Sequence, residues 1–228
     1  MKHRTSWLKP AFSFTQVNRN KKSIGLSFQH EEGVQILHRL AAKCDILVEN
    51  YLPGSLKKYG MDYETLRGIN PGLIYASITG YGQTGPYSNR AGYDVMVEAE
   101  FGLMHITGTR DGPPVKVGVA VTDLTTGLYT SNSIMAALLA RARTGRGQHI
   151  DVALSDCQTA TLANIASSCL ISGKRDSGRW GTAHRESTLI PSRRQSRERL
   201  LLTWSSSIYC PIQILSDKGR RHSLRWWK

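Results

Sequence analysis

One aspartate stands where a carboxylate could act as a nucleophile. Asp123 lies between a predicted strand over 115–121 and a predicted long helix over 124–143. Functional sites of α/β sheets gather at the carboxyl ends of strands. The dipole and free amides of a helix N-terminus stabilise an anion there, and a positioned, ionised carboxylate can act as a nucleophile. An Asp at such a place is more commonly a helix cap, so position alone leaves both roles open.

A glycine-dense loop follows a second predicted strand. The apolar run 73–79 leads directly into 80–86, which contains Gly80 and Gly82. Loops of this kind let the backbone approach a ligand or surround an anion. Neither a Walker A pattern nor GxGxxG is present, so the sequence does not support a nucleotide site of those classes. A plain connecting loop is the commoner alternative.

The end of the first predicted strand offers a further candidate. Glu49 and Asn50 close the apolar stretch 44–50, again at the favoured edge of a sheet. Asn50 could hydrogen-bond a ligand, although an Asn that forms a turn before Pro-Gly is more common. The basic run 18–22 could contact phosphates, or could be an ordinary solvated surface segment.

Metal and disulfide sites are not expected. The cysteines have no CxxC pairing, and neither His38 nor His184 has partners at ligand spacing. The isolated cysteines favour a reducing compartment. The four of them are Cys44, Cys157, Cys169 and Cys210.

Helical and strand patterns alternate through the middle of the chain. This alternation predicts an α/β fold with a Rossmann-like, largely parallel sheet flanked by helices, and irregular terminal segments. The predicted helices cover 31–43, 62–69, 94–104, 124–143 and 157–172, and the predicted strands cover 44–50, 73–79, 115–121 and 149–154.

The net charge of +13 does not indicate a nucleic-acid binder, because of where the charge lies. Residues 1–22 carry six Lys or Arg and no acid, and 185–228 carry ten with three acids. Residues 23–184 carry fourteen of each sign. A nucleic-acid-binding fold usually has its basic patch on the folded domain. We therefore expect neither a nucleic-acid partner nor a membrane partner. No apolar run reaches the roughly 20 residues of a membrane helix.

Five blocks of sequence carry a resemblance to a known family. They are NRNKKSI (18–24), CDILVENY to AGYD (44–94), GLMHITG (102–108), GPPVKVGVAVTDLTTGLY (112–129) and ARTGRGQHIDVALSD (142–156). In this order they resemble the family III CoA-transferases, especially the succinyl-CoA:glutarate type. The resemblance covers about residues 17–184. The segment 1–16 and the basic tail 185–228 do not match, and the tail is predicted to be disordered.

The resemblance implies a reaction. Asp123 matches the family's nucleophile, which attacks an acyl-CoA thioester to form a mixed anhydride. The released CoA thiolate then forms an aspartyl-CoA thioester, and an incoming carboxylate collects the CoA. This covalent chemistry uses coenzyme A as a substrate and needs no metal or other cofactor. A dicarboxylic acid is the expected acceptor.

The resemblance also implies contacts with CoA. Leu26 matches a residue of the adenine region, and Asn50 with Tyr51 matches an Asn-aromatic pair at a strand end. Lys58 stands where the family often has an Arg that reaches a CoA phosphate. Leu154 matches an apolar contact.

Three residues are expected close to the substrate, namely Tyr93, Gly80 and Gly82. Tyr93 separates two activities of the superfamily, because acyl-CoA racemases usually carry a His base at that place. Tyr, with an unperturbed pKa near ~10, is a poor base at neutral pH. Transfer is therefore favoured over racemisation.

Other interpretations remain open at this point. The chain lacks the family's opening unit and second half, so we expect a truncated or frameshifted reading frame. An inactive member of the family is then one alternative, and a binding module that uses the basic ends is another. The family forms interlocked homodimers, an arrangement that both missing flanks make doubtful here. The expected compartment is the mitochondrial matrix or the cytosol.

Overall fold

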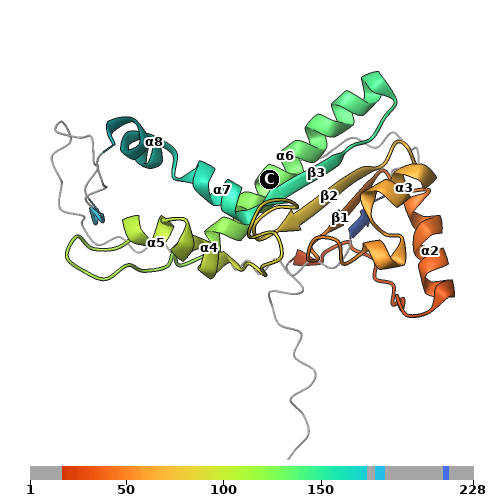
Figure 1. The fold of residues 1–228 in the computed structure, drawn as a ribbon, viewed down its shortest axis with the longest axis horizontal. Coiled ribbons are helices and arrows are strands. Elements are labelled where there is room, and N and C mark those ends of the chain that lie inside the picture. The colour runs from red at the N-terminus through yellow and green to blue at the C-terminus, as the bar shows by residue number, and fades with distance from the viewer. Residues whose placement is uncertain (1–16, 174–177, 183–212, 216–228) are drawn as a thin grey trace, which may run out of the picture. The chain divides into compact units, whose positions relative to one another are not determined.

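The structure is a computed structural model that describes residues 17–173, 178–182 and 213–215 (Figure 1). The segment 1–16, which was predicted not to match the family, lies outside the described residues, as does 185–228 apart from its short strand. None of the helices in the described part of the chain combines the length and apolar character needed to cross a bilayer.

A sheet in the order β3-β2-β1-β4 forms the centre of the described fold. Its strands are β1 (Ile46–Glu49), β2 (Ile74–Thr79), β3 (His149–Ala153) and β4 (Gln213–Leu215). β1 pairs in parallel with β2, and β4 pairs antiparallel with β1. The N–H of Tyr75 donates to Gln148 and that of Ser155 to Gly80, so β3 also runs parallel to β2. The predicted α/β fold with a parallel sheet is confirmed (Figure 1).

Local signals place the helices beside β1. In α2 (Glu31–Ala41), two glutamates occupy the first turn, where the helix dipole favours negative charge. Asp62 caps α3 (Tyr63–Ile69) as predicted, because its carboxylate accepts the N–H of Thr65 at 3.2 Å. A short 3₁₀ helix, η1 (Lys57–Tyr59), precedes α3.

The long helix α6 (Val121–Thr144) ends as predicted but begins earlier. Gly145 follows its last turn at φ 71°, and its N–H donates to the carbonyl of Arg141. The predicted strand over 115–121 is wrong, since the described residues form no strand there. The backbone N–H of Val117 donates to the carboxylate of Glu98 instead of to a neighbouring strand.

Two predicted helices are each broken in two. Gly102, at φ 89°, separates α4 (Asp94–Glu100) from α5 (Leu103–Ile106). A second break separates α7 (Leu154–Thr161) from α8 (Ala163–Ser172), where Ala163 adopts φ 48°. A residue with left-handed backbone angles interrupts a right-handed helix. The spacing of apolar residues can continue across such a break, so the sequence pattern does not reveal it.

The chain divides into two compact units. The first unit comprises the described residues of Met1–Ile24, Thr79–Tyr129 and Val152–Tyr209, and the second those of Gly25–Ile78, Thr130–Asp151 and Cys210–Lys228. The second unit holds an apolar core that joins α2, β1, α3 and β2. Its buried members are Leu37, Ala41, Cys44, Leu47, Leu56, Met61, Leu66, Leu73 and Tyr75.

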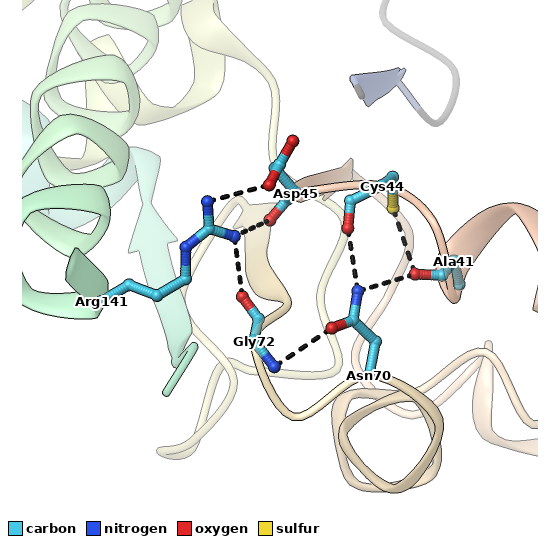
Figure 2. A network of polar contacts seen from close by, with 6 residues as sticks. All are labelled: Ala41, Cys44, Asp45, Asn70, Gly72 and Arg141. Atoms are coloured by element: carbon cyan, nitrogen blue, oxygen red, sulfur yellow. Dashed lines mark hydrogen bonds and ion pairs between the residues drawn. The ribbon is translucent and has the colours of Figure 1, made fainter. Parts of the chain in front are cut away.

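The side chain of Asn70 forms hydrogen bonds beside this core, near the starts of β1 and β2 (Figure 2). Its amide nitrogen donates to the carbonyl oxygens of Ala41 at 3.0 Å and of Cys44 at 2.9 Å. Its side-chain oxygen accepts the N–H of Gly72 at 3.1 Å. One side chain therefore links the end of α2, the start of β1 and the turn before β2.

Arg141 connects α6 to the same place (Figure 2). Its guanidinium group donates to the Asp45 carboxylate at 2.9 Å and to the Gly72 carbonyl at 3.0 Å. Both partners lie where β1 and β2 begin. The ion pair thus anchors the C-terminal part of α6 beside the strands.

Replacing Asn70 tests the contribution of these bonds. Asn70→Ala removes one donor from each of two carbonyls and the acceptor of one N–H, so we expect a loss of about 2 kcal/mol in the free energy of unfolding. The measurement is urea unfolding followed by circular dichroism. Asn89→Ala, at an exposed position, serves as the control and should leave the midpoint unchanged. Equal midpoints for the two variants would contradict this role of Asn70.

Candidate functional site

Asp123 is the third residue of α6 and is half-buried. Its backbone N–H donates to Oδ1 of Asp94, the first residue of α4, at 3.0 Å. The expected place between a strand and a helix is therefore corrected, because Asp123 lies inside the first turn of α6, a loop precedes that helix, and a second carboxylate accepts its N–H. The first N–H groups of a helix have no partner within the helix, and Asp94 supplies one.

The electrostatics of Asp123 differ from the expectation for a helix start. Burial and, as the smaller cause, the negative charge of Asp94 together raise the pKa of Asp123 to about 6. These two effects outweigh the stabilisation of the anion that a helix N-terminus offers. The carboxylate is still largely ionised at neutral pH, and it is more basic than a solvated Asp. Both properties suit a nucleophile.

Sequence reasoning missed Glu98, which lies one helical turn after Asp94. Glu98 is fully buried, and its Oε2 accepts the N–H of Val117 at 3.0 Å. Its Oε1 is buried with no hydrogen-bond partner found among the described residues. Burial raises the pKa of Glu98, and the nearby Asp94 contributes to the rise. An acid inside the apolar face of the predicted helix was the signal that could have identified it.

Gly80 and Gly82 have structural reasons to be glycine. A Cβ on Gly80 would lie 2.6 Å from the Cα of Gly92, so the glycine loop and the segment before α4 are in backbone contact. Gly82 adopts φ 88°, and its N–H donates to Oγ1 of Thr79 at 2.9 Å. The loop that was predicted near the substrate therefore lies against the residues that lead to Asp94.

A cluster of aromatic and charged side chains holds the same loop. The guanidinium group of Arg90 lies over the rings of Tyr81 and Tyr87, at 4.9 and 4.8 Å from their centroids. It also pairs with Glu100 at 2.6 Å, and Glu100 accepts the hydroxyl of Tyr81 at 2.7 Å. Sequence reasoning did not identify this cluster, because its members come from the loop and from the far end of α4.

Two more predicted site residues belong to the first unit with Asp123. Tyr93 occupies the N-cap position of α4, directly before Asp94, and 59% of it is exposed. Leu154 is the first residue of α7 and is buried. Tyr93 is therefore exposed to solvent, whereas Leu154 is packed inside the protein.

The other predicted CoA contacts belong to the second unit, where an aromatic cluster joins two of them. The ring of Phe28 lies 4.9 Å from that of Tyr59 and 6.4 Å from that of Tyr51. The ammonium group of Lys58 lies over the Tyr59 ring at 4.8 Å, and Leu26 packs against the core of the unit. Phe28 and Tyr59 were missed, because a single aromatic residue in a loop or in a one-turn 3₁₀ helix carries no periodic signal.

Glu49 organises the end of β1. Its side chain is buried, and its Oε2 accepts the backbone N–H of Tyr51 at 2.8 Å. Burial raises the pKa of Glu49. This bond bends the chain after the strand and leaves the side chain of Asn50 exposed. Asn50 is therefore available to a ligand.

No group of three or more His, Cys, Asp or Glu among the described residues is arranged to hold a metal ion. His38 instead bonds the carbonyl of Gly60 at 2.9 Å, and His184 lies outside the described residues.

Comparisons with known proteins agree on one family. The sequence profile of CoA-transferase family III matches residues 2–193. The chain is 55% identical over 171 residues to succinyl-CoA:glutarate CoA-transferase of Mus musculus, which covers 75% of this chain and 39% of that protein. It is 52% identical over 167 residues to succinate–glutarate CoA-transferase of Agrobacterium fabrum, and this match covers 73% of this chain and 42% of that protein.

A solved structure shows the same fold. A CAIB/BAIF family protein from Brucella suis matches with a TM-score of 0.70 at 51% identity, over 74% of this chain and 44% of that one. The chain spans less than half the length of these relatives. Because the profile matches most of its residues and the named relatives are more than half identical to it over the matched part, the chain belongs to CoA-transferase family III.

Proposed function

We propose that the chain carries out CoA transfer from a succinyl-CoA-like thioester to a dicarboxylic acid, with Asp123 as the nucleophile. The observation that carries the proposal is the half-buried Asp123 carboxylate in the first turn of α6, held by Asp94. The names of the Mus musculus and Agrobacterium fabrum relatives give succinyl-CoA or succinate together with glutarate, which supports this pair of acids.

The proposed reaction proceeds through covalent anhydride and thioester intermediates on Asp123. The ionised carboxylate of Asp123 attacks the thioester carbonyl, which forms a mixed anhydride and releases the CoA thiolate. The thiolate attacks the aspartyl carbonyl of the anhydride, which gives an aspartyl-CoA thioester and frees the first acid as a carboxylate. The acceptor carboxylate then attacks this thioester, which forms a second mixed anhydride and again releases the CoA thiolate. The thiolate attacks the acceptor's acyl carbonyl in that anhydride and gives the new acyl-CoA. Asp123 leaves as a carboxylate, and no metal or other cofactor takes part.

The properties of Asp123 fit these steps. A pKa of about 6 keeps the group ionised at neutral pH and makes it more basic than an exposed Asp. Its backbone anchor to Asp94 limits the orientations of the first turn of α6. A nucleophile held near its attacking geometry avoids part of the entropic cost of the reaction.

The CoA contacts are proposed in the second unit. The aromatic cluster around Phe28 offers flat apolar faces for a purine, and Lys58 supplies a cation for phosphate. Asn50 offers an exposed amide at the end of β1. The family's homodimer and a location in the mitochondrial matrix or the cytosol stay predictions of the resemblance.

A covalent trap tests the nucleophile. Intact-mass spectrometry of the chain after incubation with succinyl-CoA and borohydride should show a modification that maps to Asp123. Asp123→Asn should abolish it, because an amide does not attack a thioester. Asp156→Asn is the matched control, since Asp156 is the exposed third residue of α7 in the same unit.

Two outcomes would contradict the proposal. One is a folded chain without any adduct, and the other is an adduct that persists in Asp123→Asn. Exchange of the α-proton of the acyl group with deuterated water, without an adduct, would favour the racemase alternative instead.

The raised pKa predicts a cost in stability. A folded-state pKa above the unfolded value means that protonation of Asp123 stabilises the fold, and that this gain is lost as pH rises through about 6. Asp123→Asn should therefore raise the free energy of unfolding at about pH 7.5, by on the order of 1 kcal/mol after allowance for solvent screening. The difference should shrink toward about pH 4.5.

Urea unfolding at several pH values measures this difference. The exposed Asp156→Asn should show a smaller and flatter difference from the wild type. A stability gain for Asp123→Asn that is the same at both pH values would mean that the charge of Asp123 is not its cause.

A further inference from the structure

The carboxyl group of Glu98 presents an unusual combination of contacts. The residue has no exposed surface, one oxygen accepts the Val117 N–H, and the other has no donor within the part of the chain that the structure describes. Asp94, one turn earlier on α4, has its side chain within hydrogen-bonding reach of Glu98. Two ionised carboxylates cannot hydrogen-bond one another, because neither carries a donor.

A proton on Glu98 resolves this arrangement. An ionised carboxylate at a fully buried position is costly unless a cation or several donors pair with it. The charged groups that act on Glu98 are Asp94 on its own helix and Lys116 in the loop before α6. One lysine faces two carboxyl groups, so neutralising the more buried of them, Glu98, lowers the repulsion between them.

We propose that Glu98 is a positioning residue for the transfer reaction proposed above, whose protonated carboxyl group donates to the Asp94 carboxylate that holds Asp123. Oε2 accepts the Val117 N–H, and Oε1 carries the proton that points to Asp94. The inference rests on the proposed role of Asp123, and it extends the machinery to a residue that does not itself touch the reacting atoms.

The proton has two effects on the nucleophile. It orients the Asp94 carboxylate, whose other contact is the backbone N–H of Asp123 at 3.0 Å. It also removes one negative charge beside Asp94, the residue whose own charge contributes to the raised pKa of Asp123.

Two substitutions at Glu98 separate a proton donor from an anion. Glu98→Gln keeps the shape, the acceptor for Val117 and a donor for Asp94, all without charge. Its rate of adduct formation with succinyl-CoA and its pH profile should stay within about twofold of the wild type. Glu98→Leu removes both contacts. It should slow adduct formation by about tenfold or more and move the acid limb of the profile.

Infrared spectroscopy provides a readout that does not depend on activity. In the chain labelled with ¹³C-glutamate, a protonated carboxyl band should be present at neutral pH and absent in Glu98→Gln. Glu32→Leu, at an exposed position on α2, is the control and should keep both the band and the rate.

The outcomes are distinguishable. Absence of the protonated band, or a loss of tenfold or more in folded Glu98→Gln, would overturn the proposal. If the wild-type chain forms no adduct, the proposed function fails, and the positioning role fails with it. The band would still decide whether Glu98 carries a proton. If Glu98→Leu does not fold, Glu98→Gln and the infrared band alone decide.

Discussion

The backbone N–H of Asp123 is held by a carboxylate of another helix, and the arrangement around the candidate nucleophile depends on this bond. The first turn of any helix has N–H groups that its own carbonyls cannot reach. Asp94 fills that need for α6 and at the same time places a negative charge beside Asp123. Capping and electrostatics are therefore coupled at one residue, since the contact that fixes the nucleophile also contributes to its raised pKa.

The core of the fold could be predicted from the sequence because its signals are local. Continuous apolar runs marked β1 and β2, Asp62 marked the start of α3, and Gly145 marked the end of α6. The prediction of a strand over 115–121 was wrong. The alternation of apolar residues there is typical of a strand, but the described residues provide no neighbouring strand for its backbone to pair with. The breaks at Gly102 and Ala163 depend on backbone angles that an apolar period does not encode.

The candidate site was predictable only in part, for similar reasons. Asp123 was identified by its type and place, although the loop before α6 replaced the expected strand. Glu98 escaped notice because a single acid among apolar residues has meaning only when its burial and its partner are known. The same is true of Phe28, which joins Tyr51 and Tyr59 through ring contacts that no sequence spacing predicts.

The backbone contact between Gly80 and Gly92 has a consequence for reading other sequences of this kind. Two chain segments that touch at their Cα atoms leave no volume for a side chain on either one. A larger residue at one position must push the segments apart, and the displaced segment leads directly into Asp94. The two glycines together therefore indicate whether a related sequence can place this segment in the same way. A related sequence that keeps Asp94 and Asp123 but has a larger residue at either glycine position must place the backbone before Asp94 differently.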